Sequence, residues 1–433
     1  MTTVMMDIGT GAKTATRPQL RIATAGSVDD GKSTLIGRLL HDTKTIFEDQ
    51  LAAVGRASKR YGDGEFNLAL LTDGLRAERE QGITIDVAYR YFATPARSFI
   101  VADTPGHAQY TRNMVTGASV SDLAIVLVDA RNGMSEQTRR HAFVSAMLGV
   151  HQIVLAVNKM DLVDWDQGTF DRIAKETAEY VQALPNPVPV TAIPISALLG
   201  DNVVDRSENT PWYDGPALLE LLETIDVTDQ DVVGARLAVQ WIIRPHGSEF
   251  HDYRGYAGQL TGGALEVGDA VVVLPQGHAT TVTGIDHGGV PVSRAEAGQA
   301  VSIQLAHDLD ASRGDVIVAA NARLAPVVTD SVIADVCWMI GKPLTPGSRW
   351  IAKHRTRTVK VTVEAVLHRR DITSLEPHED VALEMNDLGQ VRLRFTAPLA
   401  VDRYDDHREG GRLVLIDEAT STTAGALMIR STS

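Results

Sequence analysis

A stretch of glycine, serine, aspartate and lysine near the start of the chain has the spacing of a phosphate-binding loop. It reads GSVDDGKST and fits the pattern G-x-x-x-x-G-K-S; its members are Gly26, Ser27, Val28, Asp29, Asp30, Gly31, Lys32, Ser33 and Thr34. Glycine permits tight turns, so successive backbone N–H groups point into one hollow, and a following helix adds the positive end of its dipole. Lys32 would reach the β- and γ-phosphates of a nucleotide, and the Ser33 hydroxyl would bind Mg²⁺. The alternative is a glycine-rich turn before a helix, and residues further along the chain distinguish the two.

A second motif, DTPGH, supplies parts that a phosphate loop needs; its residues are Asp103, Thr104, Pro105, Gly106 and His107. The Asp103 carboxylate is placed to hold Mg²⁺ through a bound water, opposite Ser33. The Gly106 N–H has no side chain in its way and can bond the γ-phosphate, a bond that exists only while that phosphate exists. The segment is therefore predicted to act as a switch, although the same residues also suit an ordinary strand-end turn.

Two further residues are expected beside the reacting phosphate. His107 could orient the attacking water, since a neutral imidazole both donates and accepts hydrogen bonds; the alternative is a solvated loop histidine. Thr84, in EREQGITID at 78–86, would give a hydroxyl to Mg²⁺ and a backbone N–H to the γ-phosphate, unless it only begins the next strand. The predicted Mg²⁺ ligands are thus Ser33, Thr84 and Asp103, and the predicted catalytic residues are Lys32, Thr84 and His107.

A third motif, NKMD, addresses the base of the nucleotide; its residues are Asn158, Lys159, Met160 and Asp161. The Asp161 carboxylate only accepts hydrogen bonds, and guanine offers a matching edge of two donors that adenine lacks. Asn158 and Lys159 would steady the loop and cover the ring. The tripeptide Ser196, Ala197 and Leu198 is a weaker candidate for a second wall, with the Ala197 N–H meeting the guanine oxygen. GTP is therefore the predicted nucleotide, with Mg²⁺.

The elements that must position these motifs are short apolar strands alternating with helices. Strands are predicted at 20–26, 85–92, 98–107, 123–130, 152–161 and 190–198, and helices at 32–40, 48–61, 107–118, 136–148, 167–183 and 216–224. This alternation indicates an α/β domain with a mainly parallel sheet and helices on both faces. The polar motifs follow carboxyl ends of strands, where such sheets bind ligands, so one nucleotide site is expected.

The pattern changes near residue 230 to short β-rich runs separated by turn signals, which is typical of small antiparallel barrels. The expected organisation is a flexible tail at 1–19, a GTP-binding domain at 20–230, a β-barrel at 231–325 and a second β-barrel at 326–433. The stretch KHRTRTVKVTV at 353–363 alternates basic with small or apolar residues, and indicates either a solvated strand face or a contact with a partner or nucleic acid. Two tryptophans, Trp338 and Trp350, indicate core anchoring or a protein interface.

Composition narrows the class of protein. The chain has 433 residues, 44% hydrophobic and 22% charged, and a formal net charge of −14, which argues against broad binding to the nucleic-acid backbone. Cys337 is the single cysteine, so an intramolecular disulfide is excluded and a small buried side chain is expected. The first 19 residues lack the apolar core of a signal peptide, and no run of 18 apolar residues occurs. A cytoplasmic protein without membrane contact is expected.

The motifs GSVDDGKS, GIT, DTPGH and NKMD, in that order and followed by two β-rich regions, resemble the translation-factor class of GTPases. Within that class the chain is most similar to the GTPase subunit family of sulfate adenylyltransferases. The similarity is carried by Asp30, where elongation factors usually have histidine, and by STLIGRLLHDT at 33–43, LLTDGLRAEREQGITIDVAYRYF at 70–92, DTPGHAQYTRNMVTGAS at 103–119, SALLGDNV at 196–203, PWYDGPALLELLE at 211–223 and NDLGQVRL at 386–393.

That resemblance implies a function and partners. A smaller catalytic subunit, in a heterodimer or higher assembly, would make adenosine 5′-phosphosulfate from ATP and sulfate, and GTP hydrolysis on this chain would be coupled to that uphill reaction in sulfate assimilation. An adenylylsulfate kinase, fused in some relatives, would be separate here, since no second phosphate loop follows. The alternatives are an elongation-factor-like carrier of aminoacyl-tRNA and a GTP-regulated scaffold without coupled chemistry. No nucleic-acid binding is expected of the sulfate adenylyltransferase subunit, whereas the aminoacyl-tRNA carrier would bind tRNA, so nucleic-acid binding distinguishes these two functions.

Overall fold

The chain forms two compact units in a computed structural model that describes residues 19–44, 86–106, 111–227, 233–245, 253–379 and 382–432. The first unit comprises Met1–Ala142, Val150–Gln182 and Pro187–Thr228, and the second holds the remaining residues. Thr84, His107 and the helix expected at 48–61 lie outside the described residues. Among the described helices, none is long and apolar enough to cross a membrane.

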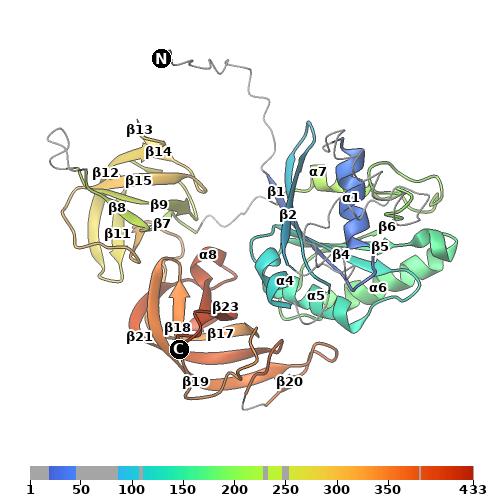
Figure 1. Ribbon diagram of the computed structural model, residues 1–433. Helices are drawn as coiled ribbons and strands as arrows, with labels where there is room; N and C mark the ends of the chain where they lie inside the picture. Colours follow the sequence, from blue (N-terminus) through green and yellow to red (C-terminus); the bar gives the residue numbers. More distant parts are fainter. Residues whose placement is uncertain are drawn as a thin grey trace, which may run out of the picture. The chain divides into compact units, whose positions relative to one another are not determined.

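The first unit is built on a six-stranded sheet with the order β2-β3-β1-β4-β5-β6 (Figure 1). The strands are β1 (Leu20–Ala25), β2 (Ala88–Ala93), β3 (Ser98–Asp103), β4 (Leu123–Asp129), β5 (Gln152–Asn158) and β6 (Val190–Pro194). All pairings are parallel except that of the edge strand β2 with β3. Every residue of β4 is buried, as its unbroken apolar run requires of a strand covered on both faces.

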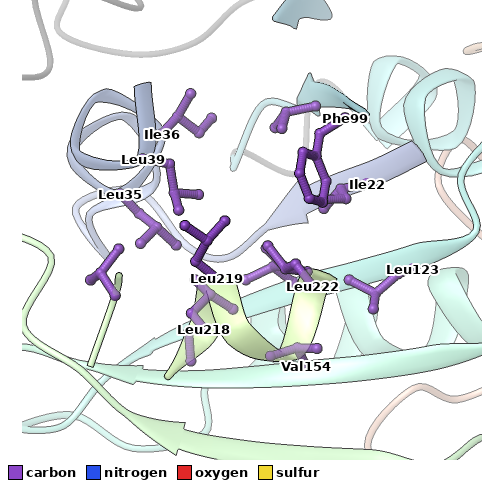
Figure 2. Packing of buried hydrophobic residues seen from close by; sticks show 14 of the residues in the cluster. Ile22, Leu35, Ile36, Leu39, Phe99, Leu123, Val154, Leu218, Leu219 and Leu222 are labelled. Atoms are coloured by element: carbon purple, nitrogen blue, oxygen red, sulfur yellow. The ribbon is translucent and has the colours of Figure 1, made fainter. Parts of the chain in front are cut away.

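Helices cover both faces of this sheet because neighbouring strand residues point to opposite sides. The helices are α1 (Lys32–Asp42), α4 (Thr111–Ala118), α5 (Glu136–Met147), α6 (Gln167–Gln182) and α7 (Leu218–Thr224), with a 3₁₀ turn η3 (Met160–Val163) after β5. In β5, Val154 belongs to the cluster that holds α1 and α7, whereas Leu155 packs with residues of α6. Figure 2 shows Leu35 and Leu39 of α1 lying beside Leu219 of α7 above the sheet. This packing fixes the start of α1, where the phosphate loop ends.

Two closed antiparallel barrels make up most of the second unit, which confirms the predicted fold class. The first barrel contains β7 (Arg236–Ala238), β8 (Trp241–Ile243), β9 (Gly255–Thr261), β11 (Ala270–Leu274), β12 (His278–His287), β13 (Val290–Val292), β15 (Ala300–Leu305) and β16 (Val316–Ala319), and the pairing of β11 with β12 closes it. A separate two-stranded sheet is formed by β10 (Leu265–Glu266) and β14 (Arg294–Ala295). The second contains β17 (Val327–Trp338), β18 (Arg349–His354), β19 (Arg357–Arg370), β20 (Pro377–His378), β21 (Leu388–Val401), α8 (Arg408–Gly411), β22 (Arg412–Ile416) and β23 (Thr423–Thr432), closed by β18 with β19.

The basic segment at 353–363 forms the β18–β19 hairpin, and its turn contacts the first barrel. The Thr356 hydroxyl donates to the Val239 carbonyl at 2.9 Å, and Arg357 lies 3.5 Å from the Asp315 carboxylate. The outward residues Lys353 and Lys360 are exposed. The segment is therefore a solvated strand face joined to an internal contact. Trp338 and Trp350 pack edge to face in the core with ring centroids 4.9 Å apart, so core anchoring is the correct interpretation. Cys337, next to Trp338 in sequence, is also buried.

A buried ionic cluster joins the two barrels. Asp402 accepts from Arg236 at 2.9 Å and from Arg355 at 2.6 Å, and its own side chain is nearly inaccessible. Burial alone would raise the pKa of Asp402, but His407 and the two guanidinium groups outweigh burial and lower it to about 2. Burial, reinforced by the charge of Arg355, lowers the pKa of the neighbouring His354 to about 3.

These two groups predict that the barrels lose stability as the pH falls. His354 normally titrates near 6.5, so below that pH the unfolded chain takes up a proton that the folded chain refuses, at up to about 1.4 kcal/mol per pH unit. The stabilising charge of Asp402 is lost only lower, between its usual pKa of 3.8 and about 2. The urea-unfolding midpoint, followed by tryptophan fluorescence, should therefore fall steadily from pH 6.5 to pH 4.

His354→Gln keeps an N–H for the Gly410 carbonyl, which His354 Nε2 meets at 2.8 Å, but it cannot titrate. Its midpoint should depend less steeply on pH than that of the wild type. The exposed His278→Gln is the control and should keep the wild-type slope. Equal slopes in wild type and His354→Gln would contradict the assignment.

Candidate functional site

The phosphate-loop motif lies between β1 and α1, at the carboxyl edge of the parallel sheet. Gly31 caps α1 with φ of 92°, in the left-handed region that favours glycine. A Cβ on Gly31 would also lie 2.4 Å from the Asn158 Nδ2 atom, so a larger residue would push the guanine motif away. The Asp30 carboxylate accepts from the Ser27 N–H at 2.6 Å and closes the turn. Burial raises the pKa of Asp30, although the Ser27 bond and Lys32 oppose this.

Lys32 occupies the middle of the loop. Its ammonium donates to the carbonyls of Gly26 and Ser27, both at 2.8 Å, and the residue is buried. Burial lowers the pKa of Lys32, while the nearby carboxylates of Asp103 and Asp30 act against the shift. The loop therefore holds a cation at the place where phosphate charge is expected.

The DTPG part of the second motif lies against the phosphate loop. Asp103 pairs with Thr24 in the register of β3 and β1, and the Thr104 hydroxyl donates to the Thr24 carbonyl at 2.5 Å. A Cβ on Gly106 would lie 2.5 Å from Lys32 Nζ and 2.6 Å from the Gly26 oxygen. Only glycine fits so close an approach. Pro105 lies between Thr104 and Gly106, and all three are buried.

Two of the three predicted Mg²⁺ ligands, Ser33 and Asp103, lie among the described residues. Asp103 is buried at the end of β3. It pairs in register with Thr24 of β1, the strand that leads into the phosphate loop with Ser33. A hydroxyl and a carboxylate are hard oxygen ligands of the kind that Mg²⁺ prefers, and Mg²⁺ usually keeps several waters. Within the described ranges there is no group of three or more His, Cys, Asp or Glu suited to a metal. The third predicted ligand, Thr84, is outside those ranges.

The guanine motif follows β5 and is joined to the phosphate loop by its first two side chains. Asn158 Nδ2 donates to the Asp30 carbonyl at 2.7 Å, and Lys159 Nζ donates to the Asp29 carbonyl at 2.5 Å. Lys159 has a left-handed backbone with φ of 64° at the start of η3, which contains Met160 and Asp161. The structure thus brings residues separated by over a hundred positions into one site.

The Ser196–Ala197–Leu198 turn lies beside the guanine motif. The Ala197 N–H donates to Asn158 Oδ1 at 2.9 Å. The Asn158 amide is buried, and both of its ends require partners. Ser196 Oγ accepts from the Leu199 N–H at 3.2 Å, and Leu198 is exposed.

Three residues outside the sequence motifs support the site. Arg38 of α1 donates to the carbonyls of Ala197 and Leu198 and holds that turn. Ser135, before α5, meets the Ser27 hydroxyl at 2.9 Å. Asp129 pairs with Lys159 at 2.9 Å. The sequence pattern could have identified Asp129 as a site residue, because it ends an apolar strand as Asp103 does. No comparable sequence pattern marks Arg38 or Ser135.

Comparison with known proteins matches both halves of the chain. The family model for the elongation factor Tu GTP binding domain matches residues 17–230, and the GTP-eEF1A C-terminal domain-like model matches residues 331–430. The bifunctional enzyme CysN/CysC of Mycobacterium tuberculosis is 53% identical over 415 residues, which is 95% of this chain and 67% of that protein.

Sulfate adenylyltransferase subunit 1 of Vibrio parahaemolyticus is 49% identical over 414 residues, 95% of this chain and 86% of that protein. The subunit 1 protein of Aliarcobacter butzleri is 48% identical over 417 residues, 96% of this chain and 88% of that protein. A solved structure of Sup35 complexed with GDP has a TM-score of 0.44 and 22% identity, over 96% of this chain and 95% of that chain.

Proposed function

The chain belongs to the family of sulfate adenylyltransferase subunit 1, within the translation-factor GTPases, and from this premise we propose that it hydrolyses GTP to drive adenosine 5′-phosphosulfate synthesis by a partner subunit. One observation carries the proposal: the phosphate loop, the Asp103–Gly106 segment and the guanine motif meet at one edge of one sheet. Their contacts are the Asn158–Asp30 bond of 2.7 Å and the close approach of Gly106 to Lys32.

Each group has a role in this proposal. The phosphate-loop N–H groups and Lys32 bind the phosphates, and Asp161 reads the two donors on the edge of guanine. Ser33, Thr84 and Asp103 hold Mg²⁺, which when bound neutralises part of the phosphate charge. His107 orients the attacking water. Gly106 lies close to Lys32. Its N–H donates a hydrogen bond to the γ-phosphate, and that bond is lost when the phosphate is released.

Coupling to the partner requires that the GTP and GDP states bind it differently. Sulfate adenylylation is strongly uphill, and a ligand shifts an equilibrium only by its differential affinity for the two states. Reversing a ratio of 1:99 takes a difference of about 10⁴-fold. We assign this bias to the segment that begins at Gly106 and to the segment around Thr84. The partner is a small catalytic subunit that binds ATP and sulfate, and the complex is cytoplasmic.

A carrier of aminoacyl-tRNA is the second candidate, and the charges of the chain weigh against it. The formal net charge is −14. Arg355 and Arg357, in the basic hairpin for which a nucleic-acid contact was one of the two interpretations, already pair with Asp402 and Asp315. Backbone binding to RNA depends on cations that remain available to phosphates.

Reconstitution with a candidate small catalytic subunit tests the proposal. We expect adenosine 5′-phosphosulfate formed from ATP and sulfate to rise severalfold with GTP, and GDP to accumulate with product. A non-hydrolysable GTP analogue is the control and should not sustain the increase. Product formation unaffected by GTP would contradict the coupling, and GTP-dependent retention of aminoacyl-tRNA on a filter would favour the carrier instead.

A further inference from the structure

A buried carboxylate outside the sequence motifs lies beside the guanine motif. Asp129 is the last residue of β4 and is 2% exposed. Its Oδ2 atom lies 2.9 Å from Lys159 Nζ. Arg131 donates to the same carboxylate, with Nε at 3.0 Å from Oδ1 and Nη2 at 2.6 Å from Oδ2. One buried acid therefore holds two cations, and one of those cations belongs to the guanine motif.

The backbone fixes Asp129 in this place. β4 and β5 are parallel, and their register sets Asp129 opposite Asn158. The Ala130 N–H donates to the Asn158 carbonyl at 2.9 Å, and the Arg131 N–H donates to the Asp129 carboxylate at 3.0 Å. The carboxylate thus has a defined position relative to the guanine motif before any nucleotide binds.

The geometry of the Lys159 side chain depends on the position of the Asp129 carboxylate. It has three ammonium donors, of which one reaches the Asp29 carbonyl of the phosphate loop at 2.5 Å and one reaches Asp129. Its backbone is left-handed, so the long stem starts from a fixed direction. A lysine stem is otherwise flexible, and holding it in one geometry costs conformational entropy. A fixed anion at the far end of the stem reduces that freedom before binding.

The charges of this group depend on one another. Burial alone would raise the pKa of Asp129, but its bonds with Arg131 and Lys159 outweigh burial and hold the pKa well below its usual range. Asp129 therefore stays ionised. The charge of Arg131, which is half-exposed, is stabilised mainly by Asp129 and weakly by Asp161, the predicted guanine reader.

We propose that Asp129 is a positioning residue for the nucleotide: it anchors the Lys159 ammonium, so that the lysine stem covers the base and links the guanine motif to the phosphate loop. This inference rests on the proposed binding of a guanine nucleotide. Asp129 itself is not expected to touch the nucleotide. It acts through Lys159, and the two residues should therefore behave as one unit.

Asp129→Asn removes the charge and keeps the shape of the side chain. With a fluorescent GDP analogue, we expect the dissociation constant to rise about tenfold, mainly through faster release. Lys159→Met should cause a similar loss. The double variant should lose no more than about twofold beyond either single variant, because the anchor has no role without the ammonium. Losses that multiply to about a hundredfold would overturn the proposal.

Two further variants complete the experiment. The matched control is Asp122→Asn. The Asp122 carboxylate accepts from the Arg21 N–H and lies just before the first residue of β4, at the end of the strand opposite Asp129. This variant should bind the GDP analogue like the wild type. Asp129→Glu keeps the charge but displaces it, and should weaken binding about threefold. If thermal unfolding shows that Asp129→Asn does not fold, the dissociation constant of the Asp129→Glu variant becomes the test of the proposal. Wild-type affinity in Asp129→Glu would then overturn it. Failure of the wild type itself to bind GDP would instead contradict the proposed function.

Discussion

Lys32→Ala is expected to lower GTP hydrolysis by about 10² to 10³-fold, the range found when one preorganised donor to a developing charge is removed. The Lys32 ammonium lies inside the phosphate loop, 2.8 Å from the Gly26 and Ser27 carbonyls. Alanine removes the cation and leaves the Gly26 and Ser27 carbonyl oxygens without its hydrogen bonds. It also leaves Asp103 and Asp30, whose charges now act on Lys32, without that counter-charge. Both changes oppose phosphate binding.

The measurement is release of phosphate from GTP in a single turnover, together with adenosine 5′-phosphosulfate formation in the reconstituted complex. Lys44→Ala is the matched control, because Lys44 is an exposed lysine just after α1. It should hydrolyse GTP at the wild-type rate. The thermal midpoint of Lys32→Ala should be measured without nucleotide to establish that it is folded. A folded Lys32→Ala variant with undiminished hydrolysis would remove Lys32 from the mechanism.

Asp161→Asn is expected to change the preferred base from guanine to xanthine. A carboxylate accepts from the ring N–H and the amino group of guanine, and hydrogen bonds to a charged group contribute about 1.5 to 3 kcal/mol each. An amide presents a donor where guanine also has a donor. One bond loses the charge of its acceptor and the other is replaced by two facing donors, which should weaken GTP binding by about 10² to 10⁴-fold. Xanthine carries an oxygen in place of the amino group and accepts from the new amide, so XTP binding should improve.

The test compares dissociation constants for GTP and XTP in wild type and variant. Asp164→Asn is a suitable control, because Asp164 directly follows η3, three residues after Asp161, and is exposed. It should leave both constants unchanged. An Asp161→Asn variant with unaltered GTP affinity would show that another group reads the base.

Much of the fold could be predicted because its signals are local. The unbroken apolar run at 123–130 predicts a buried strand, and β4 is buried throughout. Helical spacing predicts α5 and α6 nearly to the residue, at Glu136–Met147 and Gln167–Gln182. The antiparallel direction of β2 had no such signal, because strand direction depends on the connections and not on the side chains of the strand.

Within the candidate site, the sequence alone determined the residues whose chemistry depends on their own type and spacing: the turn at Gly31, the cation of Lys32 and the acceptor of Asp161. Only the tertiary structure decided which side chains hold these residues in place. Asn158 joins Asp30 to Ala197, and Asp129 anchors Lys159. Such contacts depend on distance in space between strands β4, β5 and β6, and buried polar groups must find partners wherever the packing brings them. No spacing along the chain encodes that choice.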